Sequence, residues 1–175
     1  MKTIVYFHGY GSSSKSDKVE RLKVRFPDCE VLAFDANIDP VIALGEVGDS
    51  IMFKLVSDMH SNDSLVFVGT SLGAWLANEM SNSFGCKAVL VNPCFDPRVS
   101  LEKYGVSWGI RQKYLRMAEI NSDRKKYFVD MKDEVINHVP LLMHLDVKKV
   151  TFVNGVGHRF NGSEWDLVMN AVGEM

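Results

Sequence analysis

Three residues of this chain have the types and the order that nucleophilic catalysis requires. Ser71 lies in the sequence Gly-Thr-Ser-Leu-Gly (residues 69–73), where an apolar run typical of a β-strand meets an apolar run typical of a helix. Serine is a poor nucleophile at neutral pH and needs a base within hydrogen-bond reach, which a carboxylate in turn orients. Hydrolases with a G-x-S-x-G turn have the order Ser, then Asp or Glu, then His. The chain supplies Asp133 and His158 in that order, which predicts a catalytic triad.

The turn around Ser71 also indicates how a developing negative charge would be stabilised. A serine at a strand-to-helix turn presents its hydroxyl to substrate, and Gly69 and Gly73 lack the side chains that would collide there. The first N–H groups of the following helix point toward the same place. We expect an oxyanion hole formed by the backbone N–H groups of Leu72 and of Tyr10, which lies in the loop after the first strand.

His158 is the preferred base among the five histidines of the sequence. It lies in the glycine-rich loop 154–160, which can bring its ring over the serine. The other four fall within expected helices, at a helix end or at the turn after the first strand (His8, His60, His138 and His144). The alternative explanation of His158 is an ordinary loop histidine.

Asp133 is the preferred acid, because it lies past the end of a strand and just before an expected helix. Asp130, in the same short loop, is the alternative acid. Asp133 could also serve only as a helix N-cap, since aspartate favours that position.

The elements that must position these residues alternate between strands and helices. The strands are expected at residues 4–7, 31–34, 65–68, 87–91, 126–129 and 147–153, and the helices at 19–26, 40–60, 71–80, 134–145 and 163–172. This alternation predicts an α/β fold with a mostly parallel sheet of about six strands, covered by helices on both faces. Active sites in such sheets lie at the carboxyl ends of the strands.

The whole chain, residues 1–175, is expected to form one domain. Residues 95–125 interrupt the alternation and are expected to form a small, lid-like helical insertion over the carboxyl ends of the strands. The candidate substrate-binding residues are Tyr10 and, within the insertion, Trp108, which could equally pack the insertion onto the core.

The insertion is basic. From Phe95 to Lys126 the sequence has eight Lys or Arg against four Asp or Glu, so 8 − 4 = +4 in a chain of net charge −2. A lid of this sign would favour an anionic substrate such as an acyl-CoA thioester. The alternative is an ordinary solvated helical face.

Composition excludes several other classes of function. The 175 residues carry a net charge of −2, which gives no general attraction to nucleic acid. Three cysteines without C-x-x-C spacing argue against a disulfide framework and a zinc site, and we expect no metal or organic cofactor. No stretch approaches the roughly 20 apolar residues of a membrane span. The first apolar run is too short for a signal peptide, so a cytoplasmic protein is expected.

Two further classes of function compete with hydrolysis. In a dinucleotide-binding protein, Gly9 and Gly11 would approach a pyrophosphate and Asp35 would hold a ribose, but Ser14 stands where the third glycine belongs. In the second class, a hydrolase fold binds a ligand without catalysing its reaction.

Together these motifs resemble the α/β-hydrolase family in a minimal form that lacks the two N-terminal strands. More narrowly, the chain is similar to small bacterial esterases of the YqiA and YcfP kind along nearly its whole length. The motifs that carry the similarity are Phe7-His8-Gly9, Gly69-Thr70-Ser71-Leu72-Gly73, Asn92-Pro93, Asp133-Glu134-Val135 and Gly155-Val156-Gly157-His158. The resemblance implies hydrolysis of small-molecule carboxylic esters or thioesters through an acyl-enzyme. One departure is Asp130, which stands where many α/β hydrolases have a glycine three residues before the acid.

Overall fold

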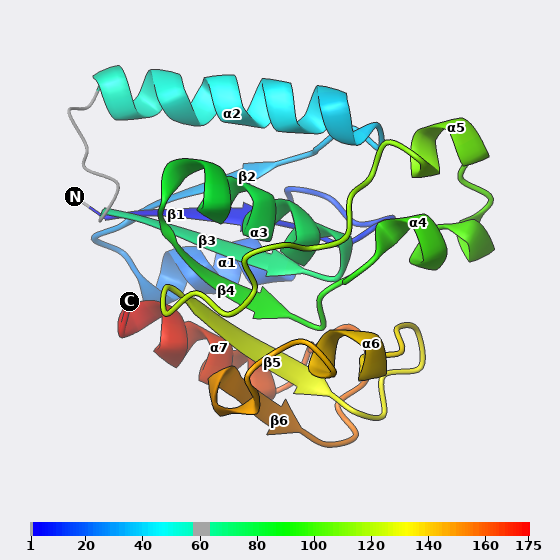
Figure 1. Cartoon of the computed structure of the whole chain (residues 1–175). Helices are drawn as coiled ribbons and strands as arrows, with labels where there is room; N and C mark the ends of the chain where they lie inside the picture. The colour runs from blue at the N-terminus through cyan, green and yellow to red at the C-terminus, as the bar shows by residue number, and fades with distance from the viewer. Residues whose placement is uncertain (1, 58–63) are drawn as a thin grey trace.

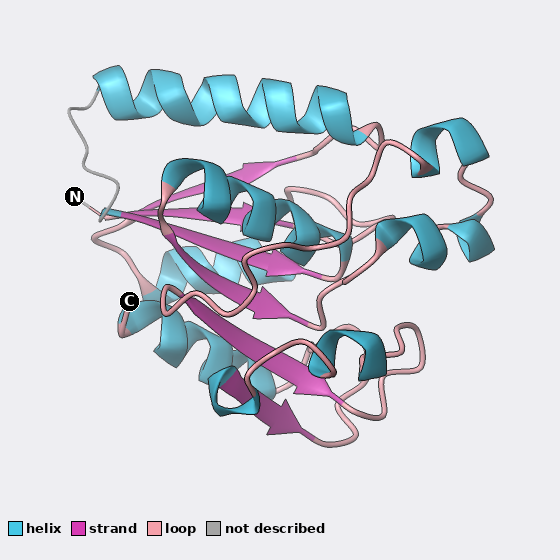
Figure 2. Ribbon diagram, in the orientation of Figure 1, coloured by secondary structure: helices cyan, strands magenta, loops and turns pink. Residues whose placement is uncertain are grey.

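A six-stranded parallel sheet organises the chain (Figure 1 and Figure 2). The computed structural model describes residues 2–57 and 64–175. The strand order is β2-β1-β3-β4-β5-β6, and every neighbouring pair is parallel. The strands are β1 (Thr3–Phe7), β2 (Glu30–Phe34), β3 (Leu65–Thr70), β4 (Lys87–Val91), β5 (Lys125–Asp130) and β6 (Val150–Val153). All six carboxyl ends therefore lie at one edge of the sheet.

Helices cover both faces of the sheet, because successive side chains of a strand point to opposite sides. In β1, Ile4 and Tyr6 belong to the buried cluster of α1 and α7, whereas Val5 and Phe7 belong to the cluster of α2 and α3 (Figure 1). The helices are α1 (Asp17–Arg25), α2 (Pro40–Ser57), α3 (Leu72–Phe84) and α7 (Glu164–Gly173). Inner strands buried on both sides read as continuous apolar runs, which is the pattern seen in the sequence. The expected fold class is confirmed.

Burial falls from the centre of the sheet to its edges. Strands β1 and β3 are almost entirely buried, whereas all five residues of β2 and all four of β6 are at least partly exposed. The described part of the chain contains no helix with the length and apolar character needed to cross a membrane.

The segment 134–145 was expected to be one helix, and this prediction is wrong. Only α6 (Val139–Leu142) is helical. The Asp133 side chain accepts the backbone N–H groups of Val135 and Ile136, as a helix N-cap would. Pro140, however, would lie inside the expected helix, where it has no N–H to donate and its ring collides with the preceding turn, so α6 begins only beside it. As a result His138 lies at the N-cap of α6 and not inside a helix.

Other expected boundaries also differ from the structure or lie outside it, and helix α3 continues to Phe84, past the expected end at residue 80. Strand β6 begins at Val150, because the residues before it form the 3-10 turn η3 (Val147–Lys149), in which Asp146 accepts the N–H of Lys148. The expected helix end near His60 lies outside the described residues.

Residues 95–125 run out beyond the carboxyl ends of the strands and then return (Figure 1). The outward part contains α4 (Pro97–Ser100), η2 (Glu102–Tyr104) and α5 (Trp108–Arg111). The return part is held against α3 by side chains of that helix. Trp75 Nε1 donates to the carbonyl of Leu115 (2.8 Å), and Asn78 Nδ2 donates to that of Ala118 (3.1 Å).

The turn between β3 and α3 leaves no room for side chains at two glycines. A Cβ at Gly73 would collide with the carbonyl oxygens of Phe7 and His8, the second at 2.5 Å. A Cβ at Gly69 would lie 2.6 Å from the Cα of Ala74. The first turn of α3 therefore rests directly on the backbone at the end of β1.

We expect Gly73→Ala to lower the free energy of unfolding by about 3 kcal/mol or more, because backbone atoms must move to admit the methyl group. Gly45→Ala is the matched control, since Gly45 lies in α2 with open space at its Cβ position. Alanine there should stabilise the helix by up to about 1 kcal/mol. Urea denaturation of both variants and the wild type measures the two changes. Equal stabilities of the two variants would contradict the close packing.

Candidate active site

Ser71 follows the last residue of β3 in a strained backbone conformation. Its φ of 56° and ψ of −119° are rare for a residue with a side chain and cost roughly 1–3 kcal/mol. Its N–H donates to the carbonyl of Val91 (2.9 Å), and its own carbonyl accepts the N–H of Cys94 (3.1 Å). Both partners belong to β4 and the loop that follows it, so the neighbouring strand holds the serine in place.

Asp133 and His158 form a hydrogen-bonded pair on the loops after β5 and β6. Nδ1 of His158 lies 2.7 Å from Oδ2 of Asp133, whose side chain is 0% exposed. An ionised carboxylate only accepts hydrogen bonds, so Nδ1 carries the proton and Nε2 remains the acceptor of the neutral ring. Gly155 and Gly157 bend the loop of His158 with φ angles of 75° and 74°, which side chains disfavour.

A second histidine contacts the same carboxylate oxygen. Nε2 of His138 lies 2.9 Å from Oδ2 of Asp133, and the His138 side chain is 1% exposed. Among the described residues, Nδ1 of this ring is buried without a hydrogen-bond partner. His138 therefore donates from Nε2, because an ionised carboxylate only accepts hydrogen bonds. The sequence analysis missed this residue, whose only sequence signal is its position five residues after the acid.

The pKa of the Asp133 carboxyl reflects this set of donors. Burial alone would raise the pKa, but hydrogen bonds from His138, His158 and the backbone N–H groups of Ile136 and Val135 outweigh burial. They hold the pKa well below its usual range. The carboxylate thus stays ionised throughout the pH range in which histidines titrate.

Asp130 contacts the loop of His158 through backbone groups only. Its buried carboxylate accepts the N–H groups of Lys132 (2.9 Å), Gly155 (3.1 Å) and Gly157 (2.8 Å). Burial alone would raise the pKa of this carboxyl, but the backbone N–H groups outweigh burial and lower it. A lowered folded-state pKa stabilises the fold above about pH 4, and this stabilisation is lost as the pH falls through the folded-state value.

Asn92, directly after β4, connects the same loops. Its Oδ1 accepts the N–H of Asp130 (2.8 Å), and its Nδ2 donates to the carbonyls of Gly157 (3.4 Å) and His158 (3.3 Å). Its φ of 41° is a left-handed conformation that asparagine tolerates better than most residues. The Asn-Pro pair was noticed in the sequence, but its positioning contacts join residues more than 35 positions apart and give no local signal.

Ser71 and His158 line a common cavity of about 480 Å³, which we call the serine cavity. In the described part of the chain no hydrogen bond joins the Ser71 hydroxyl to the His158 ring; such bonds are often long in unliganded structures. Tyr10 also lines this cavity, with its ring centroid 4.9 Å from that of Tyr104. Trp108, the other expected substrate-binding residue, is 70% exposed on α5 and is not part of the cavity wall.

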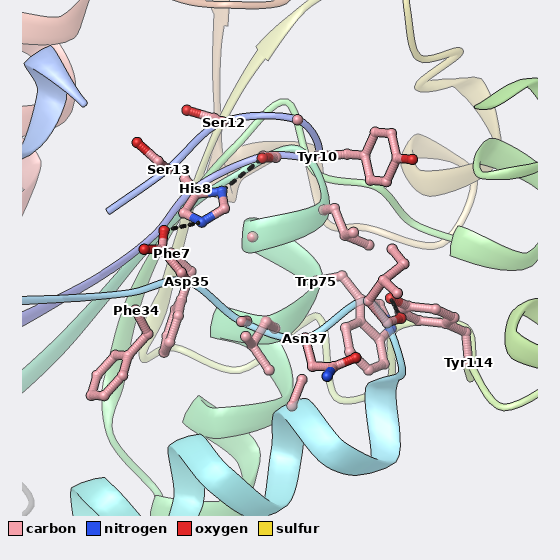
Figure 3. A pocket seen from close by; sticks show the side chains of 18 residues that line it. Phe7, His8, Tyr10, Ser12, Ser13, Phe34, Asp35, Asn37, Trp75 and Tyr114 are labelled. Carbon is pink, nitrogen blue, oxygen red and sulfur yellow. Dashed lines mark hydrogen bonds and ion pairs between the residues drawn. The ribbon is translucent and has the colours of Figure 1, made fainter. Parts of the chain in front are cut away.

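The loop after β1 packs directly against Ser71. A Cβ at Gly9 would lie only 3.1 Å from the Cβ of Ser71. The ring of His8 fixes the loop, with Nδ1 2.8 Å from the carbonyl oxygen of Gly9 and Nε2 3.1 Å from the Asp35 carboxylate (Figure 3). Leu72, the residue after Ser71, is the first residue of α3. Its backbone N–H has no acceptor within the helix, because the N–H groups of a first helical turn have none.

Asp35, the residue that would hold a ribose in a dinucleotide-binding protein, instead accepts hydrogen bonds from the backbone N–H and the hydroxyl of Ser14. Within residues 2–57 and 64–175, no group of three or more His, Cys, Asp or Glu side chains could hold a metal ion.

Several solved structures have the same fold. Est1E from Butyrivibrio proteoclasticus, solved with ferulic acid bound, has a TM-score of 0.73 at 12% identity, covering 99% of this chain and 87% of its own. A putative hydrolase of the alpha/beta superfamily from Xanthomonas campestris pv. campestris has a TM-score of 0.65 at 15% identity, covering 100% of both chains. A hyperthermophilic esterase from the archaeon Pyrobaculum calidifontis has a TM-score of 0.67 at 17% identity, covering 99% of this chain and 74% of its own.

These structural similarities establish the α/β-hydrolase fold that the motifs implied. The model of the uncharacterised protein family UPF0227 matches residues 3–167, a range that contains Ser71, Asp133 and His158. The chain therefore belongs to the UPF0227 family.

Proposed function

We propose that this protein is a serine hydrolase that cleaves carboxylic esters through an acyl-enzyme. The observation that carries the proposal is the Asp133–His158 hydrogen bond of 2.7 Å, which leaves the other ring nitrogen of His158 as an acceptor in a cavity that Ser71 also lines. A strained serine, a neutral imidazole and a buried carboxylate are the parts that acyl transfer requires. Two of the similar solved structures are described as an esterase and a hydrolase, which supports the same reaction class.

In this proposal Ser71 Oγ attacks the ester carbonyl carbon while Nε2 of His158 takes its proton. The carbonyl oxygen becomes negative and accepts hydrogen bonds from the backbone N–H groups of Tyr10 and Leu72. The bond to the leaving oxygen then breaks, and His158 returns the proton to that oxygen as the alcohol departs. Water, activated by the same histidine, hydrolyses the acyl-enzyme and regenerates the serine. Asp133 stays ionised and holds the ring in one tautomer.

The charge of residues 95–126 does not single out acyl-CoA as the substrate. Arg124, Lys125 and Lys126 lie at the amino end of β5, at the edge of the sheet opposite Ser71. Lys113 pairs with Asp39, an acidic residue outside the segment. The excess positive charge is thus spread over the molecule, and we propose carboxylic esters as the substrate class.

Labelling of the nucleophile tests the proposal directly. After incubation with a fluorophosphonate, intact-protein mass spectrometry should show one adduct on the wild type and none on Ser71→Ala, because only an activated serine displaces the fluoride. Ser50→Ala, on the outer surface of α2, is the matched control and should be labelled like the wild type. Folded wild type without an adduct would favour a binding role, and an adduct on Ser71→Ala would place the nucleophile elsewhere.

Paired substitutions distinguish the two candidate acids. Asp133→Asn should lower kcat for a p-nitrophenyl ester by roughly 10³–10⁴-fold, because the neutral amide cannot hold the imidazole tautomer. Asp130→Asn should instead lower the free energy of unfolding by about 1–3 kcal/mol, since its N–H donors lose charged acceptors, and should reduce the acid sensitivity of that free energy below pH 4. Steady-state kinetics and urea denaturation at two pH values measure both effects. If Asp130→Asn loses kcat and Asp133→Asn loses only stability, Asp130 is the acid of the triad.

His138 is a positioning residue in this proposal, and the pH profile tests its role. His138 and His158 both donate a hydrogen bond to Oδ2 of Asp133. In His138→Phe, His158 is the one ring left at this oxygen, so the negative charge of the carboxylate acts more strongly on His158. We expect the acidic limb of the kcat/KM profile to move to higher pH by roughly one unit, because the protonated imidazole is better stabilised. His138→Gln retains an N–H donor and should restore the wild-type limb. A loss of activity without any displacement of the limb would reduce His138 to a packing role.

A further inference from the structure

A second cavity, of about 350 Å³, lies next to Ser71 between β1, the N-terminal turns of α2 and α3, and the return part of residues 95–125 (Figure 3). We call it the apolar cavity. Its walls include side chains of Phe34, Ile38, Ala43, Leu72, Trp75 and Tyr114. Its lining also includes His8, Asp35 and Asn37, and it differs from the serine cavity, whose lining includes Lys18, Arg159 and Asn161.

The polar side-chain atoms of Trp75 and Tyr114 already have partners. Trp75 Nε1 donates to the carbonyl of Leu115 (2.8 Å), and Tyr114 Oη donates to the carbonyl of Ile38 (2.7 Å). The two rings pack edge to face at 4.8 Å. A ligand on the side of Trp75 and Tyr114 therefore meets hydrocarbon and ring surface, without competing for these hydrogen bonds.

Ser71 stands at the boundary between the two cavities. The loop from Gly9 to Ser12 lines both of them. Thr70, which precedes the serine, lines the serine cavity, and Leu72, which follows it, lines the apolar cavity. A carbonyl carbon bonded to Ser71 would therefore have one kind of surface on each side.

We propose that the apolar cavity holds the acyl chain of the ester and that the leaving alcohol departs through the serine cavity. This inference rests on the proposed function. With the carbonyl oxygen at the N–H groups of Tyr10 and Leu72 and Ser71 Oγ bonded to the carbonyl carbon, the acyl chain and the leaving oxygen diverge in the two directions that remain. The leaving oxygen has to reach His158 for its proton, and His158 lines the serine cavity alone. The acyl chain is left with the apolar side.

The volume of the cavity sets the length of the chain. At about 30 Å³ for a group the size of a water molecule or a methylene, about 350 Å³ accepts roughly ten such groups. The structure thus favours an unbranched acyl chain of about six to ten carbon atoms. The acyl group of an acetyl ester would leave most of the cavity empty, and the end of a much longer acyl chain would extend out of the cavity.

The test is an acyl-chain series on the wild type and on Ala43→Phe. Ala43 is 3% exposed and lines the cavity, so the added ring would fill it. On p-nitrophenyl acetate, butyrate, octanoate and dodecanoate, the wild type should have its highest kcat/KM at octanoate. Ala43→Phe should lower the octanoate-to-acetate ratio of kcat/KM by at least about tenfold. Val41→Phe is the matched control, since Val41 is 64% exposed on the same helix, and it should keep the wild-type ratio.

The outcomes separate this inference from the proposed function. If Ala43→Phe reacts with the fluorophosphonate and its chain-length profile equals that of the wild type, the acyl chain lies elsewhere, although the serine works. If folded wild type neither reacts with the fluorophosphonate nor hydrolyses any ester, the proposed function itself fails. Ile38→Ala enlarges the same cavity and covers the case in which Ala43→Phe does not fold. Its optimum should move toward dodecanoate, and an unchanged optimum would overturn the inference.

Discussion

The contact between the first turn of α3 and the end of β1 is the constraint on which the rest of the site depends. Because Gly73 has no Cβ, the helix rests on the carbonyl groups of Phe7 and His8. This approach forces the chain at Ser71 into a strained conformation, which the hydrogen bonds to Val91 and Cys94 maintain. The strain of roughly 1–3 kcal/mol is affordable only because the central strands and α3 share one buried cluster. One close packing contact therefore places the serine, the loop after β1 and the helix N-terminus together.

The other half of the site depends on buried polar groups. Asn92, Asp130 and Asp133 are acceptors or donors that tie together the loops after β4, β5 and β6. Each buried oxygen has a partner, so these groups position the loops without the cost of an unpaired acceptor. His138 is the exception, since its Nδ1 has no partner among the described residues. A buried ring that accepts this cost for one hydrogen bond to Asp133 is consistent with a positioning role in the proposed reaction.

Most of the fold could be predicted from the sequence, because a doubly covered parallel sheet needs apolar strands and amphipathic helices in alternation, and each leaves a local pattern. The order of Ser71, Asp133 and His158 also had a local basis, since each follows a strand. The helix expected over 134–145 failed because Pro140 lies in its middle, where a residue without an N–H interrupts the helical hydrogen bonds, a signal that the sequence did contain. Trp108, which is exposed on α5, shows a different limit of the sequence, because an aromatic residue in a polar segment gives no sign of whether it turns toward a cavity or toward solvent.

The two cavities follow from the two faces of the sheet. Tyr6 belongs to the core between the sheet and α1 with α7, and it lines the serine cavity, whereas Phe7 belongs to the core on the α2 and α3 side and lines the apolar cavity. Each cavity is thus the continuation of one face beyond the strand ends. The apolar cavity opens where the aromatic residues of the larger core reach the edge, and the serine cavity opens where the shorter α1 leaves polar residues. Ser71 lies beside the end of β1, where Tyr6 faces the serine cavity and Phe7 faces the apolar cavity. In the proposed reaction the two substituents of the carbonyl carbon therefore meet different surfaces. Selectivity for the acyl chain would then be a direct consequence of the alternation of side chains within β1.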